Sequence, residues 1–177
     1  CGILGPRSIM GHGIYLTKDE LQMLAKTQTV LAHCPSSNAP IRDLGLGSGL
    51  FDLRKIEKSN INWALGSDIG GGPYLSMFDV INSFVTQNKK VKVSGASYIK
   101  AIYRATLAGA KVLKRDNECG NLIDNKWANF IVLERPKRKK TDDPENLLKR
   151  LIHLPKNKRH LYESFVQKTF HKGHLVY

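Results

Sequence analysis

The sequence predicts an α/β fold in which strands and helices alternate. Three short apolar segments are each followed by a helical pattern, and successive units of this kind form parallel sheets through right-handed crossovers. Their apolar character indicates strands that are buried on both faces. The three predicted strands cover residues 8–10, 29–32 and 62–65. After Gly120 the pattern changes to short strand-like runs, which predict a second region of β type.

The helices are predicted from capping signals and periodicity. Thr17 and Glu20 have the spacing of a capping box, ahead of the helix that follows the first strand. A long loop with prolines and glycines separates the second strand from a helix over about 50–58. A third helix is expected over about 75–86, and an alanine-rich helical region over about 96–113 is expected to pack outside the sheet.

The change of pattern after Gly120 divides the chain into two regions. Residues 1–120 hold the strand–helix units, and residues 121–177 hold a β-type return with a basic insertion at about 136–158. Its predicted strands cover residues 129–133, 164–168 and 174–177.

The positive charge is concentrated in one segment. The formal net charge is +13, and much of it falls within residues 135–159, which contain PKRKK and PKNKR. A run of this kind is typical of a solvated loop, and no aromatic residue is interleaved with it to stack on bases. Nucleic-acid binding through this segment is therefore an alternative hypothesis and not the leading one. The histidines of the basic tail are expected to be exposed to solvent: His153, His160, His171 and His174.

Composition sets the class of protein and its compartment. No run of about 18 apolar residues is present, so no membrane span is expected, and the first residues lack the order of a secretory signal. The three cysteines, Cys1, Cys34 and Cys119, lack CxxC spacing, which argues against disulfides and a thiolate zinc site. These features predict a cytoplasmic protein. Because the sequence starts without Met, we expect it to be part of a longer chain.

A polar residue follows each of the three predicted strands. These residues are His12, His33 and Asp68. The carboxyl ends of parallel strands form the edge at which α/β proteins build active sites, so the three side chains are expected to point into one cleft. Two imidazoles and a carboxylate suit a divalent metal such as zinc, and they also suit acid–base chemistry without a metal.

Other interpretations of the same residues remain open. Taken alone, His12 is as often a hydrogen-bonded structural histidine as a functional one. Asp68 also has the position of a turn carboxylate or a helix N-cap before the glycines at 70–72. Phosphate binding by these glycines is disfavoured because no Walker lysine is present. A Cys34 nucleophile with His33 as its base is disfavoured because successive strand residues point to opposite faces.

The order of motifs along the chain resembles a known family. The segments GHGIYLTKDEL, LAHCPSSN, LGSGLFDL and ALGSDIGGGPYLSMFDVI resemble the amidohydrolase superfamily and, within it, the guanine deaminases. The closing segments CGNLIDNKWANFIVLE and TFHKGHLVY are similar to the return into the small β-sandwich of that family. The resemblance covers nearly the whole sequence apart from about residues 136–158, and LGSGL combined with GSDIGGGPYLSM is its most specific part.

The resemblance implies a fold and a function. It implies a metal-dependent TIM barrel, of which this chain supplies the last three βα units, followed by the C-terminal part of the β-sandwich. It implies hydrolytic deamination of guanine to xanthine and ammonia, with one zinc ion per active site. In that family an aspartate at the position of Asp68 binds zinc and moves protons, and a histidine at the position of His12 stabilises developing charge. His33 and Asn38 would line the same mouth.

The resemblance also sets limits on this chain. The HxH pair and the further histidine and glutamate of the family have no counterpart here. We therefore expect the isolated chain to be inactive. Members of this family commonly pair, which implies that the complete protein is a homodimer. The alternatives are a related aminohydrolase acting on another heterocycle, a catalytically inactive relative, and the nucleic-acid-binding module described above.

Overall fold

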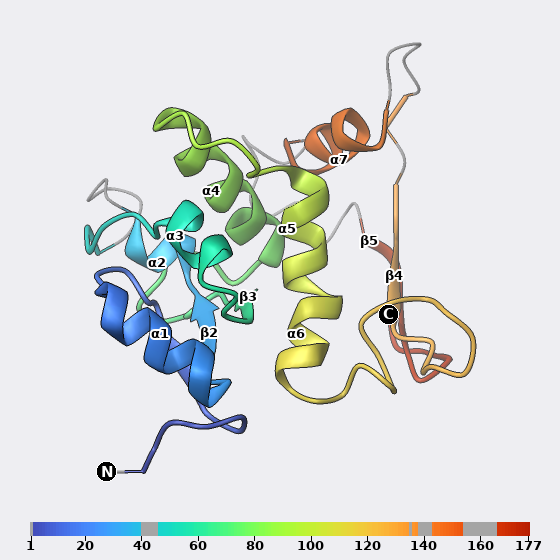
Figure 1. Ribbon diagram of the computed structural model, residues 1–177. Coiled ribbons are helices and arrows are strands. Elements are labelled where there is room, and N and C mark those ends of the chain that lie inside the picture. Colours follow the sequence, from blue (N-terminus) through green and yellow to red (C-terminus); the bar gives the residue numbers. More distant parts are fainter. Residues whose placement is uncertain (1, 40–45, 135, 138–142, 154–165) are drawn as a thin grey trace.

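A parallel three-stranded sheet forms the centre of the molecule. The computed structural model describes residues 2–39, 46–134, 136–137, 143–153 and 166–177. The strands are β1 (Ile9–Gly11), β2 (Val30–His33) and β3 (Trp63–Leu65), paired in the order β1-β2-β3. The prediction of successive strand–helix units in an α/β fold is therefore confirmed, with strand bounds that shift by about one residue (Figure 1).

The helices that follow the strands begin at local capping signals. In α1 (Lys18–Thr27) the expected capping box is present, because Thr17 and Glu20 bond each other's backbone N–H groups. In α3 (Leu53–Lys58) Asp52 is the N-cap, and in α4 (Met77–Lys90) Ser76 is the N-cap.

The predicted helical region at 96–113 consists of two helices. They are α5 (Tyr98–Ala105) and α6 (Leu107–Val112), separated at Thr106. Both contact β3 and form a column beside the sheet, as predicted (Figure 1). The guanidinium of Arg104 in α5 donates to the Trp63 carbonyl at 3.0 Å and lies 4.1 Å from the centre of the Trp63 ring.

A short helix that the sequence did not predict follows β2. This helix, α2 (Pro35–Asn38), lies at the start of the segment expected to be a long loop, and it has proline at its first position. All four of its residues are buried. Its contacts with α4 show that tertiary packing stabilises this single turn, because an isolated four-residue helix is unstable in water.

The second predicted β region is also present. The strands β4 (Phe130–Leu133), β5 (Val166–His171) and β6 (His174–Leu175) form an antiparallel sheet in the order β4-β5-β6. The rings of Phe130 and Phe170 stack across β4 and β5 with centroids 4.6 Å apart. The division of the chain near residue 120 stays a prediction.

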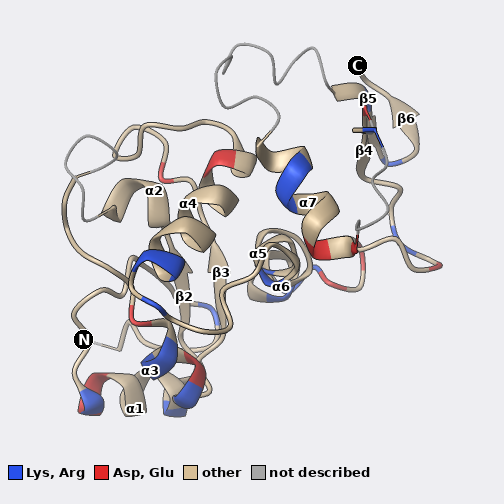
Figure 2. Ribbon diagram, turned by 90° about the horizontal axis from the view of Figure 1, so that it is seen from above, with Lys and Arg blue, Asp and Glu red and all other residues tan. Residues whose placement is uncertain are grey.

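Part of the basic insertion is a packed helix, so its prediction as a solvated loop is wrong there. Residues Pro144–His153 form α7, which packs against α4 and α5 (Figures 1 and 2). The Glu145 carboxylate accepts hydrogen bonds from the backbone N–H groups of Tyr98 and Ile99, at 2.8 and 3.0 Å. Leucines and Ile152 recur at helical spacing between the basic residues, and burial of this apolar face favours the helix.

The histidines of the basic tail differ in exposure. His153 is half-buried at the end of α7, and its Nε2 lies 2.7 Å from the hydroxyl of Tyr98, so its predicted exposure is wrong. The expected exposure of His171 and His174 is confirmed. His160 lies outside the described residues. None of the described helices combines the length and the apolar character that a bilayer crossing requires.

Truncation of Ile152 tests whether α7 belongs to the core. Ile152 is 3% exposed and joins the main apolar cluster. We expect Ile152→Ala to lower the free energy of unfolding by about 2 to 4 kcal/mol through lost burial and a residual cavity. Lys149→Ala, on the exposed face of the same helix, is the control and should change it by less than about 0.5 kcal/mol. Equal effects in denaturant titrations of the two variants would contradict this packing.

Candidate active site

His12 stands directly after β1 and is held by the neighbouring strand and by α2. Its backbone has φ 70°, and its N–H donates to the Ala32 carbonyl at 2.8 Å. Its Nδ1 lies 3.2 Å from Oδ1 and 3.0 Å from Nδ2 of Asn38, whose side chain is 3% exposed. When Nδ1–H donates to the amide oxygen, Nε2 is left as an acceptor that faces the site. The predicted site residues His12 and Asn38 are therefore brought together.

Asp68 follows β3 in a tight turn. Its φ is 50°, and its carbonyl accepts a hydrogen bond from the Gly72 N–H at 2.6 Å. A Cβ atom at Gly72 would lie only 2.7 Å from the Ser67 carbonyl oxygen, so the turn requires glycine there. The hydroxyl of Ser37 in α2 donates to Oδ2 of Asp68 at 2.6 Å. Because Ser76 and not Asp68 caps α4, the interpretation of Asp68 as a helix N-cap is excluded.

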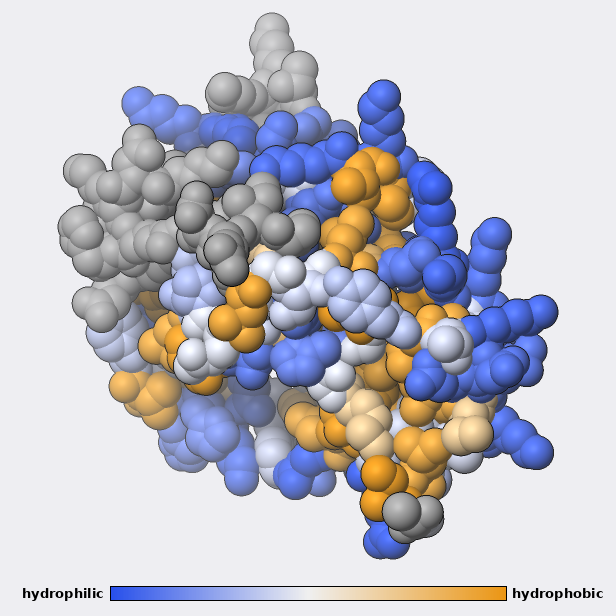
Figure 3. Space-filling model, turned by 90° about the vertical axis from the view of Figure 1, so that its left-hand side faces the viewer, coloured by the Kyte–Doolittle hydropathy of each residue, from blue (hydrophilic) through white to orange (hydrophobic). Residues whose placement is uncertain are grey.

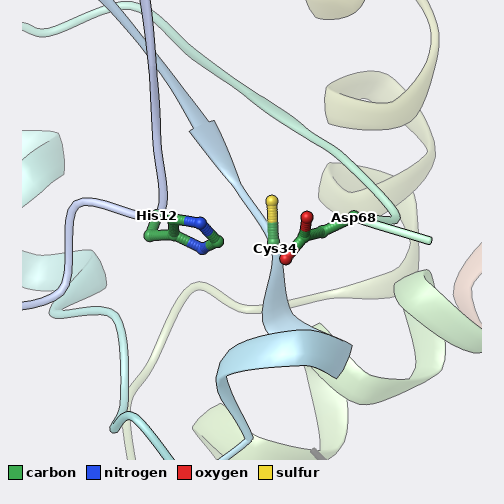
Figure 4. Close-up of side chains that lie close together, drawn as sticks. All are labelled: His12, Cys34 and Asp68. Atoms are coloured by element: carbon green, nitrogen blue, oxygen red, sulfur yellow. The ribbon is translucent and has the colours of Figure 1, made fainter. Parts of the chain in front are cut away.

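Cys34 is a site residue that the sequence reasoning did not select. One ligand atom each from His12, Cys34 and Asp68 lies within 4.8 Å of the others (Figure 4). Burial raises the pKa of the Cys34 thiol to about 11, with a further contribution from the negative charge of Asp68. The sequence gives no sufficient signal for this placement, because Val30, Leu31 and Ala32 are all apolar and do not show which face of the strand meets the core.

His33 lies in the aromatic core and not beside His12 and Asp68. Its ring is 1% exposed and stacks on Phe51 with centroids 4.0 Å apart. The rings of Trp63 and Phe84 meet it edge-on. Among the described residues its Nδ1 has no hydrogen-bond partner. The expectation that all three strand-end side chains point into one cleft therefore differs from the structure at His33.

The burial of His33 predicts a pH dependence of stability. Desolvation lowers the pKa of His33 to about 3, with a smaller contribution from His12, so the folded protein takes up this proton less readily than the unfolded chain. The contribution of neutral His33 to the free energy of unfolding is fully present above pH 6.5. It is lost as the pH falls toward 3, at up to about 1.4 kcal/mol per pH unit. We expect His33→Phe, which keeps an aromatic ring against Phe51, to remove this part of the slope in denaturant titrations between pH 4 and 7. The same slope in both proteins would contradict the assignment.

The donor atoms of the site suit a divalent metal ion. Carboxylate, imidazole and thiolate groups are the ligands that zinc takes in proteins. One oxygen of Asp68 is held by Ser37 and one nitrogen of His12 faces Asn38, which leaves Oδ1 and Nε2 available. Outer hydrogen bonds of this kind fix the orientation of metal ligands. Asp68 therefore fits as one ligand of a zinc site to which further ligands are added, with His12 beside the metal.

The family of the chain follows from its sequence as well as from this site. The model of the Amidohydrolase family matches residues 1–176, and the chain belongs to this family. The resemblance to guanine deaminases is confirmed as well: the Escherichia coli (strain K12) guanine deaminase is 36% identical over 135 residues, which cover 75% of this chain and 29% of that protein.

Two solved structures show how far the fold is shared. The structure of the E. coli guanine deaminase matches with a TM-score of 0.83 and 28% identity, over 99% of this chain and 40% of that chain. An adenosine deaminase from Xanthomonas campestris with bound zinc matches in fold, with a TM-score of 0.76 and 24% identity, over 98% of this chain and 38% of that chain. The chain thus spans well under half the length of the proteins that it matches.

Proposed function

We propose that the complete protein containing these residues is a zinc-dependent guanine deaminase, which hydrolyses guanine to xanthine and ammonia. The observation that carries this proposal is the pairing of Asp68 and His12 at the carboxyl edge of the parallel sheet, each held by its own partner from α2. The similarity to the E. coli guanine deaminase supports the choice of substrate, and the zinc bound by the structurally similar adenosine deaminase supports the choice of metal.

The proposed architecture is the end of a (β/α)₈ barrel. In it, residues 1–120 supply the last three βα units, and residues 121–177 supply the C-terminal part of a small β-sandwich. The parallel order β1-β2-β3 and the TM-score of 0.83 over 99% of the chain support this arrangement. Ile9 on β1 is 44% exposed, as expected where further strands of a barrel would pair with this sheet.

Each residue of the site has a role in this proposal. A bound zinc ion would supply an activated water and a positive charge. Asp68 would bind the metal and carry protons to the departing amino nitrogen, a task that its position beside the metal allows. In the tautomer in which Nδ1 accepts from the Asn38 amide, His12 would donate a hydrogen bond from Nε2 to the charge that develops on the purine. Asn38 would keep His12 oriented at the mouth, whereas the burial of His33 supports a packing role instead of contact with guanine.

Residues 1–177 alone are expected to be inactive. In the family the other zinc ligands come from an HxH pair and a further histidine, which this sequence does not contain. We propose one zinc ion per complete active site, a cytoplasmic location and a homodimer. Apolar patches lie between hydrophilic residues on the face that carries α1 and α3, and such patches favour association of two copies (Figure 3). Light scattering of the complete protein would test the proposed dimer.

Zinc analysis and ammonia release test the proposed function directly. The complete protein is expected to contain about one zinc per chain and to release ammonia from guanine. Adenine and a chlorinated triazine serve as competing substrates. Turnover of one of these without turnover of guanine would favour the alternative of a related aminohydrolase, and absence of both zinc and turnover would overturn the proposal.

Replacement of Ser37 tests the support of Asp68. Ser37→Ala removes the hydroxyl that holds Oδ2 of Asp68, and we expect a loss of about 10- to 100-fold in zinc affinity or kcat. Ser36→Ala is a matched control, because Ser36 is equally buried on α2 and its hydroxyl has no partner among the described residues. Equal losses in both variants would show that packing of α2, and not the bond to Asp68, is responsible.

A charge reversal on α7 tests the nucleic-acid alternative better than deletion of residues 136–158. Such a deletion would remove α7 and its buried Ile152 together with the charges. Lys149→Glu changes an exposed charge and leaves the packed face intact. Salt-sensitive RNA or DNA binding that weakens in this variant would favour the alternative, whereas guanine turnover should be unchanged under our proposal.

A further inference from the structure

We infer that Tyr15 is a positioning residue of the active site, because its hydroxyl anchors residues 46–49, the segment that holds α2 in place (the 46–49 loop). The inference deepens the proposed function and rests on it for the reaction whose rate is measured. Tyr15 acts on Asp68 and His12 through α2 and not by touching the substrate.

The helix α2 holds both residues of the proposed reaction. Ser37 donates a hydrogen bond to Oδ2 of Asp68, and the Asn38 amide lies beside Nδ1 of His12. Figure 4 shows the side chains of His12 and Asp68 pointing toward one another, beside the turn of α2. Because α2 has only four residues, its orientation depends on the segments that contact it.

The 46–49 loop supplies hydrogen bonds at the end of α2. The last carbonyl groups of a helix have no partner within the helix itself. Three backbone N–H groups of the loop bond to three consecutive carbonyls here, in the pairs Leu46 to Ser37 at 2.7 Å, Gly47 to Ala39 at 3.0 Å and Gly49 to Asn38 at 3.0 Å. A displacement of the loop would therefore also displace Ser37 and Asn38.

Tyr15 joins this loop to the segment that carries His12. Its hydroxyl donates a hydrogen bond to the Ser48 carbonyl. The contact is close, since a Cβ atom at Gly49 would lie 2.6 Å from the hydroxyl oxygen of Tyr15 and 3.0 Å from Cγ2 of Ile14. Gly49 also has φ 130°, a conformation that favours glycine. The segments that follow β1 and β2 are thereby joined at the edge of the sheet where the site lies.

Burial does not account for the position of Tyr15. Its side chain is 81% exposed, so the ring contributes little to the apolar core. In the described part of the chain, the bond to Ser48 is its one side-chain hydrogen bond. A bond of this kind changes an equilibrium by a factor of about 3 to 10, which sets the size of the expected effects.

Kinetics of the complete protein with guanine test the inference. Tyr15→Phe removes the hydroxyl and keeps the ring. We expect kcat to fall about 3- to 10-fold and KM to change by less than about twofold, because Asp68 and His12 are held less firmly while guanine binding is unaffected. Ser48→Ala is the matched control, because it alters the same loop, leaves the carbonyl that accepts the bond and should keep kcat.

Hydrogen exchange reports on the loop independently of turnover. In the complete protein treated with a chelator to remove zinc, the backbone amides of Leu46, Gly47 and Gly49 should exchange about 3- to 10-fold faster in Tyr15→Phe than in the wild type. The loop opens more often once its anchor is removed. Ser48→Ala should keep the wild-type rates.

Gly49→Ala provides a second variant and a double-mutant cycle. Its methyl group would displace the hydroxyl of Tyr15 from the loop. In this background Tyr15→Phe should therefore lower kcat further by less than about twofold, because the same bond is already lost. Fully additive losses in the two variants would contradict the contact.

The outcomes separate this inference from the proposed function. Unchanged exchange in Tyr15→Phe, or faster exchange without a fall in kcat, would overturn the positioning role and leave the proposed function standing. A rise in KM alone would also overturn that role, because Tyr15 would then contact the substrate. Absence of guanine turnover in the wild type would overturn the proposed function, and the exchange rates would still decide whether Tyr15 holds the loop.

Discussion

Asp68→Asn is expected to remove nearly all guanine deamination while the fold is retained. Asparagine has almost the same shape, accepts the hydrogen bond from Ser37 and tolerates the positive φ of 50° at this position. It lacks the negative charge that binds zinc and the basicity that moves protons. We expect kcat/KM for guanine to fall by roughly 10³-fold or more, with loss of much of the bound zinc.

The control for this variant is another aspartate. Asp124→Asn changes an exposed carboxylate in the turn before β4 and should leave turnover unchanged. Circular dichroism and the unfolding midpoint check that Asp68→Asn folds. Appreciable turnover by a folded Asp68→Asn protein would refute the assigned role.

His12→Ala is expected to lower turnover severely and to spare metal binding. The imidazole is exposed at the mouth, with Nδ1 engaged by Asn38, and its proposed task is to stabilise charge on the substrate. We expect kcat for guanine to fall by about 10²-fold or more, while the zinc content measured by mass spectrometry stays near one per chain. Loss of the metal would instead place His12 among its ligands.

Backbone strain at His12 calls for a second variant. The residue has φ 70°, which alanine adopts at a cost and asparagine tolerates. His12→Asn removes the imidazole with less strain, so both variants should lose activity to a similar extent. His171→Ala, at an exposed position on β5, is the control that should keep full activity.

The main elements of the fold were predictable because their signals are local. The Thr17 and Glu20 capping box, the short apolar strands and the periodic face of α4 each depend on neighbouring residues alone. Asp68 was predictable for a related reason. It is the acid that directly follows a buried strand, and parallel strands deliver such residues to one edge.

The helices α2 and α7 were not predictable from local signals. The four residues of α2 are too few to be stable alone, and their burial against α4 decides their conformation. In α7 the basic residues indicated a solvated loop, and the apolar face gains its stability only from contact with α4 and α5. Both helices therefore depend on residues far away in the sequence.

By itself the sequence determined the three strand–helix units and the later β region, the position of Asp68 and His12 at the site, and the family of the chain. Only the tertiary structure decided which of two adjacent residues at the end of β2 faces the site. Strand side chains alternate, so a single choice of face sends His33 into the aromatic core and brings Cys34 beside Asp68. That choice depends on the packing of Phe51, Trp63 and Phe84 around the ring of His33, which the fold alone brings together.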